Sequence, residues 1–140
     1  KVRTVGLIVG GLLFLLSLGG GTIADESSDG FLLGIICLLF GMGYLAWYAN
    51  PFIFLSATLL ILKRPHWAAG FAAIATALAT SALLIKEILV DEGGQTAPVT
   101  GYGMGFYLWV GCSVSLLGTS LLCVAIRLRQ IINTTHRPPG

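Results

Sequence analysis

Few side chains in this sequence are of types that carry chemistry, and they are widely separated. Asn50 stands directly before Pro51 in a long apolar run, and Lys86 and Glu87 lie at the end of another. An amide beside a proline can bind the backbone carbonyl that the proline leaves without a donor, or it can bind a ligand. A carboxylate at the end of an apolar segment can hold a cation or simply face water. Asn50, Pro51 and Glu87 are therefore the candidate residues for a kink or binding site, and the structural role is favoured at Asn50.

The other reactive residues form no recognisable site. The three cysteines lie inside apolar runs without a CxxC pair, which is typical of buried small hydrophobes. His66 and His136 stand alone in basic segments, and the acidic residues between Asp25 and Asp29 lack the spacing of a calcium loop. No nucleophile with a base and an orienting group can be assembled. We therefore predict no catalytic residue, metal or cofactor, and we expect that the protein is not an enzyme.

The elements that must position the candidate residues are apolar helices. The chain of 140 residues is 56% hydrophobic and 10% charged, whereas roughly a quarter of the residues in soluble domains are charged. The stretch from Phe31 to Leu62 contains no charged side chain, and a membrane span needs about 20 apolar residues as a helix. The sequence predicts one all-α polytopic membrane domain over residues 1–140. Its basic residues make no continuous face, which argues against nucleic-acid binding.

Four transmembrane helices in one bundle are predicted, at about residues 5–19, 31–62, 67–89 and 103–126. The first could also describe a signal peptide, but a true span is favoured. With four crossings, one side of the membrane receives Lys1, Arg3, Lys63, Arg64, Arg127, Arg129 and Arg137. The other side receives Asp25, Glu26, Asp29, Glu87, Asp91 and Glu92, with only Lys86 out of place. Cytoplasmic loops attract Lys and Arg, so both termini are expected in the cytoplasm.

The second predicted span is longer than a crossing requires, and Pro51 divides it. One interpretation is a single tilted helix with a proline kink. The favoured interpretation is a split: Phe31 to about Trp47 lies partly at the outer interface, and the chain from Pro51 to Leu62 completes the crossing. An exposed acidic loop is expected to precede it, with Ser28 or Asp29 capping a helix that begins at Phe31.

Small residues recur at four-residue intervals on the first and last spans. Gly6 and Gly10 share one helix face, and Gly111, Ser115 and Thr119 share another. Such faces allow helices to approach closely in lipid. They predict either packing within the bundle or a docking face for another membrane subunit, and the first is favoured.

Residues 99–103, Val-Thr-Gly-Tyr-Gly, are close in order to a potassium-channel filter. The first two residues are transposed relative to that filter and no apolar pore helix precedes them, so a turn into the last helix is expected instead.

A wider resemblance rests on aromatic, glycine and proline positions. Residues 47–51 (Trp-Tyr-Ala-Asn-Pro), the apolar run to Lys63-Arg64, and residues 100–109 (Thr-Gly-Tyr-Gly-Met-Gly-Phe-Tyr-Leu-Trp) resemble small four-span bacterial inner-membrane proteins of uncharacterised function. The resemblance implies a bacterial inner membrane and four spans, and it implies no activity.

The leading functional hypothesis is a non-enzymatic membrane protein that acts through helix–helix contacts. It would be an accessory or assembly subunit of a larger membrane complex, or an immunity-type protein, with the lipid bilayer and other membrane subunits as partners. The alternative is a small transporter, channel or lipid-binding membrane protein whose site lies beneath Pro51.

Overall fold

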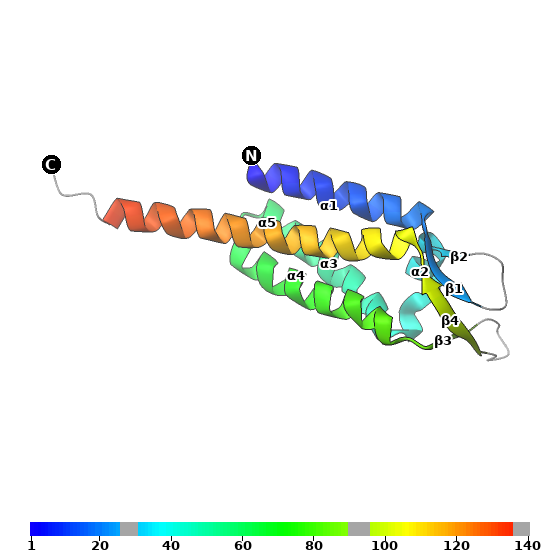
Figure 1. Ribbon diagram of the computed structural model, residues 1–140. Helices are drawn as coiled ribbons and strands as arrows, with labels where there is room; N and C mark the ends of the chain where they lie inside the picture. Colours follow the sequence, from blue (N-terminus) through cyan, green and yellow to red (C-terminus); the bar gives the residue numbers. More distant parts are fainter. Residues whose placement is uncertain (26–30, 90–95, 136–140) are drawn as a thin grey trace.

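The computed structural model describes residues 1–25, 31–89 and 96–135, and the chain is mostly helical. In chain order, with η for 3-10 helices, the elements are α1 (Val2–Gly19), β1 (Gly21–Asp25), β2 (Phe31–Leu33), α2 (Gly34–Phe40), η1 (Gly41–Gly43), η2 (Leu45–Tyr48), α3 (Ala49–Ile61), α4 (Pro65–Thr80), η3 (Ser81–Leu84), β3 (Glu87–Leu89), β4 (Thr96–Tyr102) and α5 (Met104–Thr135). The strands gather at one end of the bundle, and the start of α1 and the end of α5 lie toward the other (Figure 1). We call these the sheet end and the terminal end.

Three helical segments are long and apolar enough to cross a membrane: Val2–Gly19, Pro65–Leu84 and Met104–Thr134. A shorter apolar helical segment covers Leu45–Ile61. Large apolar side chains point outward along these helices; Leu15 and Leu16 of α1, for example, are 65% and 61% exposed. Contiguous apolar surface of this kind is unfavourable in water and normal against lipid. The protein is therefore a helical membrane protein.

The long apolar run is not one helix. It is divided into β2, α2, two 3-10 turns and α3, with the breaks at Gly41–Gly43 and Tyr44. Pro51 lies in the first turn of α3, which begins at Ala49. A proline there removes no intrahelical hydrogen bond, so it starts this helix instead of bending a longer one. The chain is split, as the favoured interpretation expected, but the break precedes the proline.

A four-stranded antiparallel sheet covers one end of the bundle, in the order β2-β1-β4-β3. The central strands are β1, which follows α1, and β4, which precedes α5. They pair with Ile23 opposite Tyr102 and Ala24 opposite Gly101. The all-α prediction has no such sheet: it treats β1 and β4 as loops and assigns the residues of β2 and β3 to the ends of the second and third spans. The strands are short, and the central pairing of β1 with β4 joins residues that lie far apart in the sequence, so no local pattern indicates it. Ser28 and Asp29, the predicted caps, lie outside the described residues, and the helix begins at Gly34.

Two other predicted boundaries also need correction. The third helical segment ends at Leu84, and Glu87 belongs to strand β3 instead of a helix end. The last helix continues to Thr135, beyond the predicted end at residue 126, because Arg127 and Arg129 are good helix formers and no glycine or proline interrupts the chain there. The filter-like residues 99–102 form part of β4, which is hydrogen-bonded to strands on both sides.

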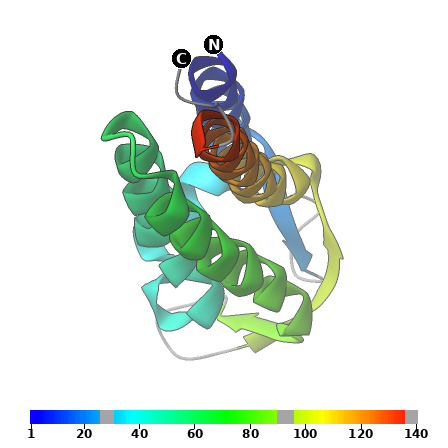
Figure 2. The same cartoon turned by 90° about the vertical axis from the view of Figure 1, so that its left-hand side faces the viewer.

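Helix α5 is the centre of the bundle, in contact with α1 on one side and α4 on the other, while α3 pairs with α4 (Figure 2). Small residues make these contacts close. A Cβ on Gly6 would collide with the side chain of Thr119, and the Ser56 hydroxyl of α3 donates to the Ala68 carbonyl of α4 at 3.0 Å. In lipid, such close approach and interhelical hydrogen bonding hold a bundle together.

Candidate functional site: an apolar chamber beneath the sheet

A chamber of about 350 Å³ lies under the sheet, between the sheet ends of the helices and the segment formed by α2, η1 and η2. This volume is within the range of about 300–1,000 Å³ that is usual for ligand pockets. Side chains from α1, β1, α2, α3, β3 and α5 line it, and most are aliphatic or aromatic. None of the described lining residues is charged.

Asn50 is the central polar residue of the chamber wall and is only 6% exposed. Its Nδ2 donates to the carbonyl oxygen of Trp47 at 3.0 Å, the acceptor that Pro51 cannot serve because proline has no N–H. Its Oδ1 accepts a hydrogen bond from the indole N–H of Trp109 at 2.9 Å. The amide therefore completes the start of α3 and ties it to α5, which is the structural role that the sequence favoured.

Other polar atoms of the lining are also engaged within the protein. The indole N–H of Trp47 donates to the Leu38 carbonyl at 2.6 Å, which holds the α2 segment against the start of α3. The Ser17 hydroxyl donates to the Phe14 carbonyl at 2.6 Å, and the Thr22 hydroxyl and the Cys37 thiol are 3.0 Å apart. With these groups occupied, the wall offers a ligand mainly apolar contact and shape.

Backbone contacts between glycines set the side of the chamber where α1 ends and α5 begins. A Cβ on Gly105 would lie 2.6 Å from the Gly20 carbonyl oxygen, and a Cβ on Gly34 would collide with the Ser17 carbonyl. The Gly34 N–H donates to Gly20 at 3.0 Å. Only glycine permits three chain segments to meet at this distance, because any side chain would separate them.

The sheet forms the roof of the chamber, and its residues alternate between the two faces. Ile88 is 3% exposed and lines the chamber, whereas its neighbour Glu87 is exposed and accepts a hydrogen bond from the Thr96 hydroxyl at 3.0 Å. The Tyr102 hydroxyl donates to the carbonyl of Ala82 at 2.8 Å, which fastens β4 to η3. Partial burial raises the pKa of Tyr102, and the nearby Tyr107 raises it further.

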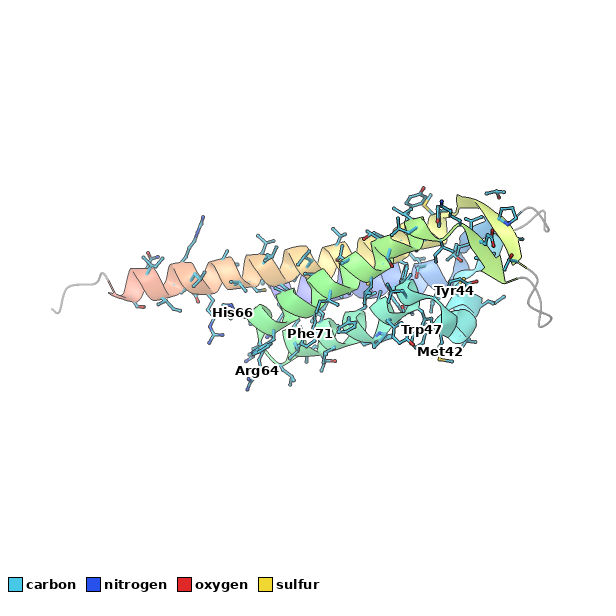
Figure 3. All side chains as sticks on the ribbon, turned by 90° about the horizontal axis from the view of Figure 1, so that it is seen from below. Met42, Tyr44, Trp47, Arg64, His66 and Phe71 are labelled. Carbon is cyan, nitrogen blue, oxygen red and sulfur yellow. The ribbon has the colours of Figure 1, made fainter. Side chains whose placement is uncertain are left out.

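The structure separates the residues that the sequence grouped as a possible binding site. Asn50 lines the chamber, whereas Pro51 is exposed and, like Glu87, lies outside the described lining. Trp109 also lines the chamber and is hydrogen-bonded to Asn50, but it lies 59 residues away in the chain and no local pattern links the two. Figure 3 shows Tyr44 and Trp47 on the segment beside the start of α3, toward the sheet end.

The small-residue rows are used largely inside the protein. Gly6, Gly10 and Thr119 are buried where α1 meets α5, and a Cβ on Gly10 would lie 3.3 Å from the side chain of Leu116. Gly111 and Ser115 are half-buried on α5. The buried members are therefore not available to another subunit.

The fold and the chamber together define a helical membrane protein with a largely apolar, partly open pocket at one end of its bundle. In residues 1–25, 31–89 and 96–135, no group of three His, Cys, Asp or Glu side chains is placed to hold a metal ion. No family model, curated protein or solved structure matches the chain.

Proposed function

We propose that the protein is a non-enzymatic membrane protein that binds the acyl chain of a lipid in the chamber beneath its sheet. The observation that carries this proposal is a cavity of about 350 Å³ whose described lining is uncharged and mostly apolar. An ion or a strongly polar solute would find no counter-charge there, and its desolvation would be uncompensated. A hydrocarbon chain needs none.

The bonding of the polar lining atoms supports the same class of ligand. Asn50, Trp47 and Trp109 use their side-chain polar groups on one another or on backbone carbonyls. A chain that moves from the bilayer into the chamber exchanges one apolar environment for another, so the gain comes from closer van der Waals contact. Selectivity would then follow chain length and shape.

We also propose four membrane crossings, with α3 and the short helices before it completing the fourth. The connection between α1 and α3 and the connection between α4 and α5 pair in one sheet. Both connections therefore lie on the same side, which supports an up-down-up-down order. The basic side chains near the terminal end support cytoplasmic termini. A bacterial inner membrane is proposed from the resemblance described above.

Association with other membrane subunits stays a prediction. The burial of Gly6, Gly10 and Thr119 within the bundle reduces the surface that motivated it.

The chamber places two tryptophans where a bound chain would touch them, and this gives a direct test. Trp47 and Trp109 line the chamber, whereas Trp67 lies at the start of α4 and is 64% exposed. In a Trp67→Phe background in mild detergent, phosphatidylcholine with brominated acyl chains should quench the remaining fluorescence. We expect the quenching to saturate at a single lipid per protein.

A filled chamber provides the decisive comparison. Ala82 lines the chamber and is 4% exposed, so Ala82→Leu should occupy part of its volume and abolish the saturable quenching. Ala73→Leu makes the same change on an exposed position of α4 and should leave the quenching intact. Equal quenching in the two variants, with both proteins folded, would show that the chamber holds no chain.

A further inference from the structure

A second hollow, of about 570 Å³, lies at the terminal end of the bundle. It is formed by the start of α1, the turn between α3 and α4, and the part of α5 that passes them. Basic side chains reach it from all three segments: Lys1, Arg3, Lys63 and Arg127. No acidic residue is among its described lining residues, and the described side chain of Glu87 lies at the sheet end. We call this hollow the basic hollow.

The four basic side chains of the hollow repel one another when no anion lies between them. Like charges repel, and the water around the exposed side chains of Lys1, Lys63 and Arg127 reduces this repulsion without removing it. Figure 3 shows Arg64 and His66 at the same end of the bundle, next to the turn. The local field at this end is therefore positive, and an anion in the hollow would relieve it.

The backbone at Lys63 supports a role for this cation. Helix α3 ends in a paired hydrogen-bond arrangement, with the Lys63 N–H donating to Leu60 at 3.1 Å and the Arg64 N–H donating to Leu59 at 2.9 Å. The residue at the position of Lys63 in this motif adopts a left-handed conformation and is usually glycine. Lys63 has φ 60° and is the only non-glycine residue with positive φ in the described chain. Strained backbone conformations cluster at functional sites, and this motivates a role for the Lys63 side chain.

The lining of the basic hollow is also partly apolar, which distinguishes a lipid from a soluble anion. Val2, Leu60 and Ile126 line the hollow beside the cations. A phospholipid presents a phosphate and hydrocarbon within a few bonds of each other, and basic pockets between membrane helices suit such headgroups. We propose that the basic hollow binds the phosphate of an anionic membrane lipid, with Lys63 and Arg127 as its principal contacts.

Native mass spectrometry of the full chain in mild detergent tests this proposal. Dioleoylphosphatidylglycerol, dioleoylphosphatidylcholine and sodium phosphate would be titrated separately. The phosphatidylcholine signal measures background binding, including binding in the chamber. We expect tighter binding of phosphatidylglycerol than of phosphatidylcholine, and no competition by sodium phosphate. Equal binding of the two lipids would overturn the proposal, and full competition by sodium phosphate would overturn the assignment to a lipid.

Variants identify the residues responsible. One cation near an anionic lipid is worth roughly a fivefold change in affinity, so Arg127→Gln and Lys63→Gly should each weaken phosphatidylglycerol binding about fivefold, and together roughly 25-fold. Lys63→Gly introduces the residue that the turn prefers, so its folding is not at risk. Arg129→Gln removes the same charge from an exposed position of α5 outside the hollow and should have no effect. Equal losses in Arg129→Gln and Arg127→Gln would contradict the site.

Discussion

The chamber and the basic hollow lie at opposite ends of one bundle, and they differ in whether their polar side chains are paired within the protein. In the chamber, the amide of Asn50 and the indole groups of Trp47 and Trp109 are hydrogen-bonded within the protein. In the basic hollow, Lys63 and Arg127 line the same space with no acidic residue in the described lining. Because the polar groups of the chamber are hydrogen-bonded within the protein, they stabilise its wall, and a ligand there would be recognised by shape. In the basic hollow, the cations have no acidic partner in the described lining, so an anionic ligand would be recognised by charge.

The two ends are also held together by different kinds of contact. The sheet end depends on residues far apart in sequence, such as Ile23 and Tyr102, and on glycine backbones in contact. At the terminal end, the local turn from Leu59 to Arg64 brings α3 to α4, and α1 packs on α5. Substitutions at the close glycine contacts of the sheet end should therefore lower stability, whereas loss of a charge at the terminal end should mainly weaken anion binding. The four predictions below test this contrast, from the largest expected effect to the smallest.

Gly105→Ala should cause the largest loss of stability. The new Cβ would lie 2.6 Å from the Gly20 carbonyl oxygen, so two backbones must separate. Overpacking of this kind costs about 3 kcal/mol. We expect a clear fall in the thermal unfolding midpoint in mild detergent. Gly118→Ala, on the same helix with no atom within 4 Å of the new Cβ, should be neutral or slightly stabilising. Equal midpoints for the two variants would contradict the close backbone contact.

Asn50→Ala should destabilise the chamber wall by about 2 kcal/mol. The change leaves the Trp109 indole N–H without its partner and removes one of the bonds to the Trp47 carbonyl, which also accepts from the Ala49 N–H. An unsatisfied buried group costs about 1–3 kcal/mol. Thermal unfolding and the Trp emission maximum would be measured together. Thr58→Ala, which removes an exposed hydroxyl bonded to the Phe54 carbonyl, should change neither by much. If Asn50→Ala behaves like Thr58→Ala, the amide does not join α3 to α5.

Lys63→Gly should have the opposite sign and increase stability by about 1 kcal/mol, because glycine adopts a left-handed conformation without the steric cost of a Cβ. Unfolding midpoints in lipid-free detergent provide the measurement. Lys63→Ala removes the charge but keeps the Cβ, so it should give no comparable gain. If alanine stabilises as much as glycine, charge repulsion rather than backbone strain is the cause.

Tyr102→Phe should have the smallest effect at neutral pH and a distinctive one in alkali. The variant loses the hydrogen bond to the Ala82 carbonyl, at a cost of about 1 kcal/mol or less. The fold raises the pKa of Tyr102 above the ordinary value of 10.0, so it favours the neutral hydroxyl. This contribution is complete below pH 10 and is lost as the pH rises through the raised pKa. The stability difference between wild type and variant should be constant from pH 6 to 9 and shrink above pH 10. A constant difference at every pH would contradict this assignment.

The apolar helices could be predicted from sequence because a continuous run of apolar residues indicates each of them. The spans predicted at residues 5–19 and 67–89 correspond to helical segments over Val2–Gly19 and Pro65–Leu84, so only the end of the second differs by more than three residues. The hydrogen bond from Asn50 to the Trp47 carbonyl was equally local, since the missing proline N–H identifies the acceptor. The side-by-side placement of basic residues from three segments followed in outline from the distribution of charge.

The sheet and the chamber could not be predicted in the same way. Strand β1 has its partner β4 more than seventy residues away, and neither strand alternates clearly between apolar and polar residues. The chamber exists because the chain breaks at Gly41–Gly43 and Tyr44, which lie inside a run that composition alone describes as one span. Lys63 shows the same limit on a smaller scale, since a lysine gives no sign of a left-handed backbone.

The pairing of β1 with β4 also has a consequence for the order in which the molecule is made. A ribosome delivers the amino-terminal part first, so β1 and β2 emerge long before β4 exists. Until then one edge of β1 has unpaired backbone N–H and C=O groups, which can pair with strands of other chains. The roof can form only after β4, Thr96–Tyr102, has been synthesised. A chain truncated before Thr96 would therefore lack the partner strand and keep this edge unpaired, which would favour aggregation.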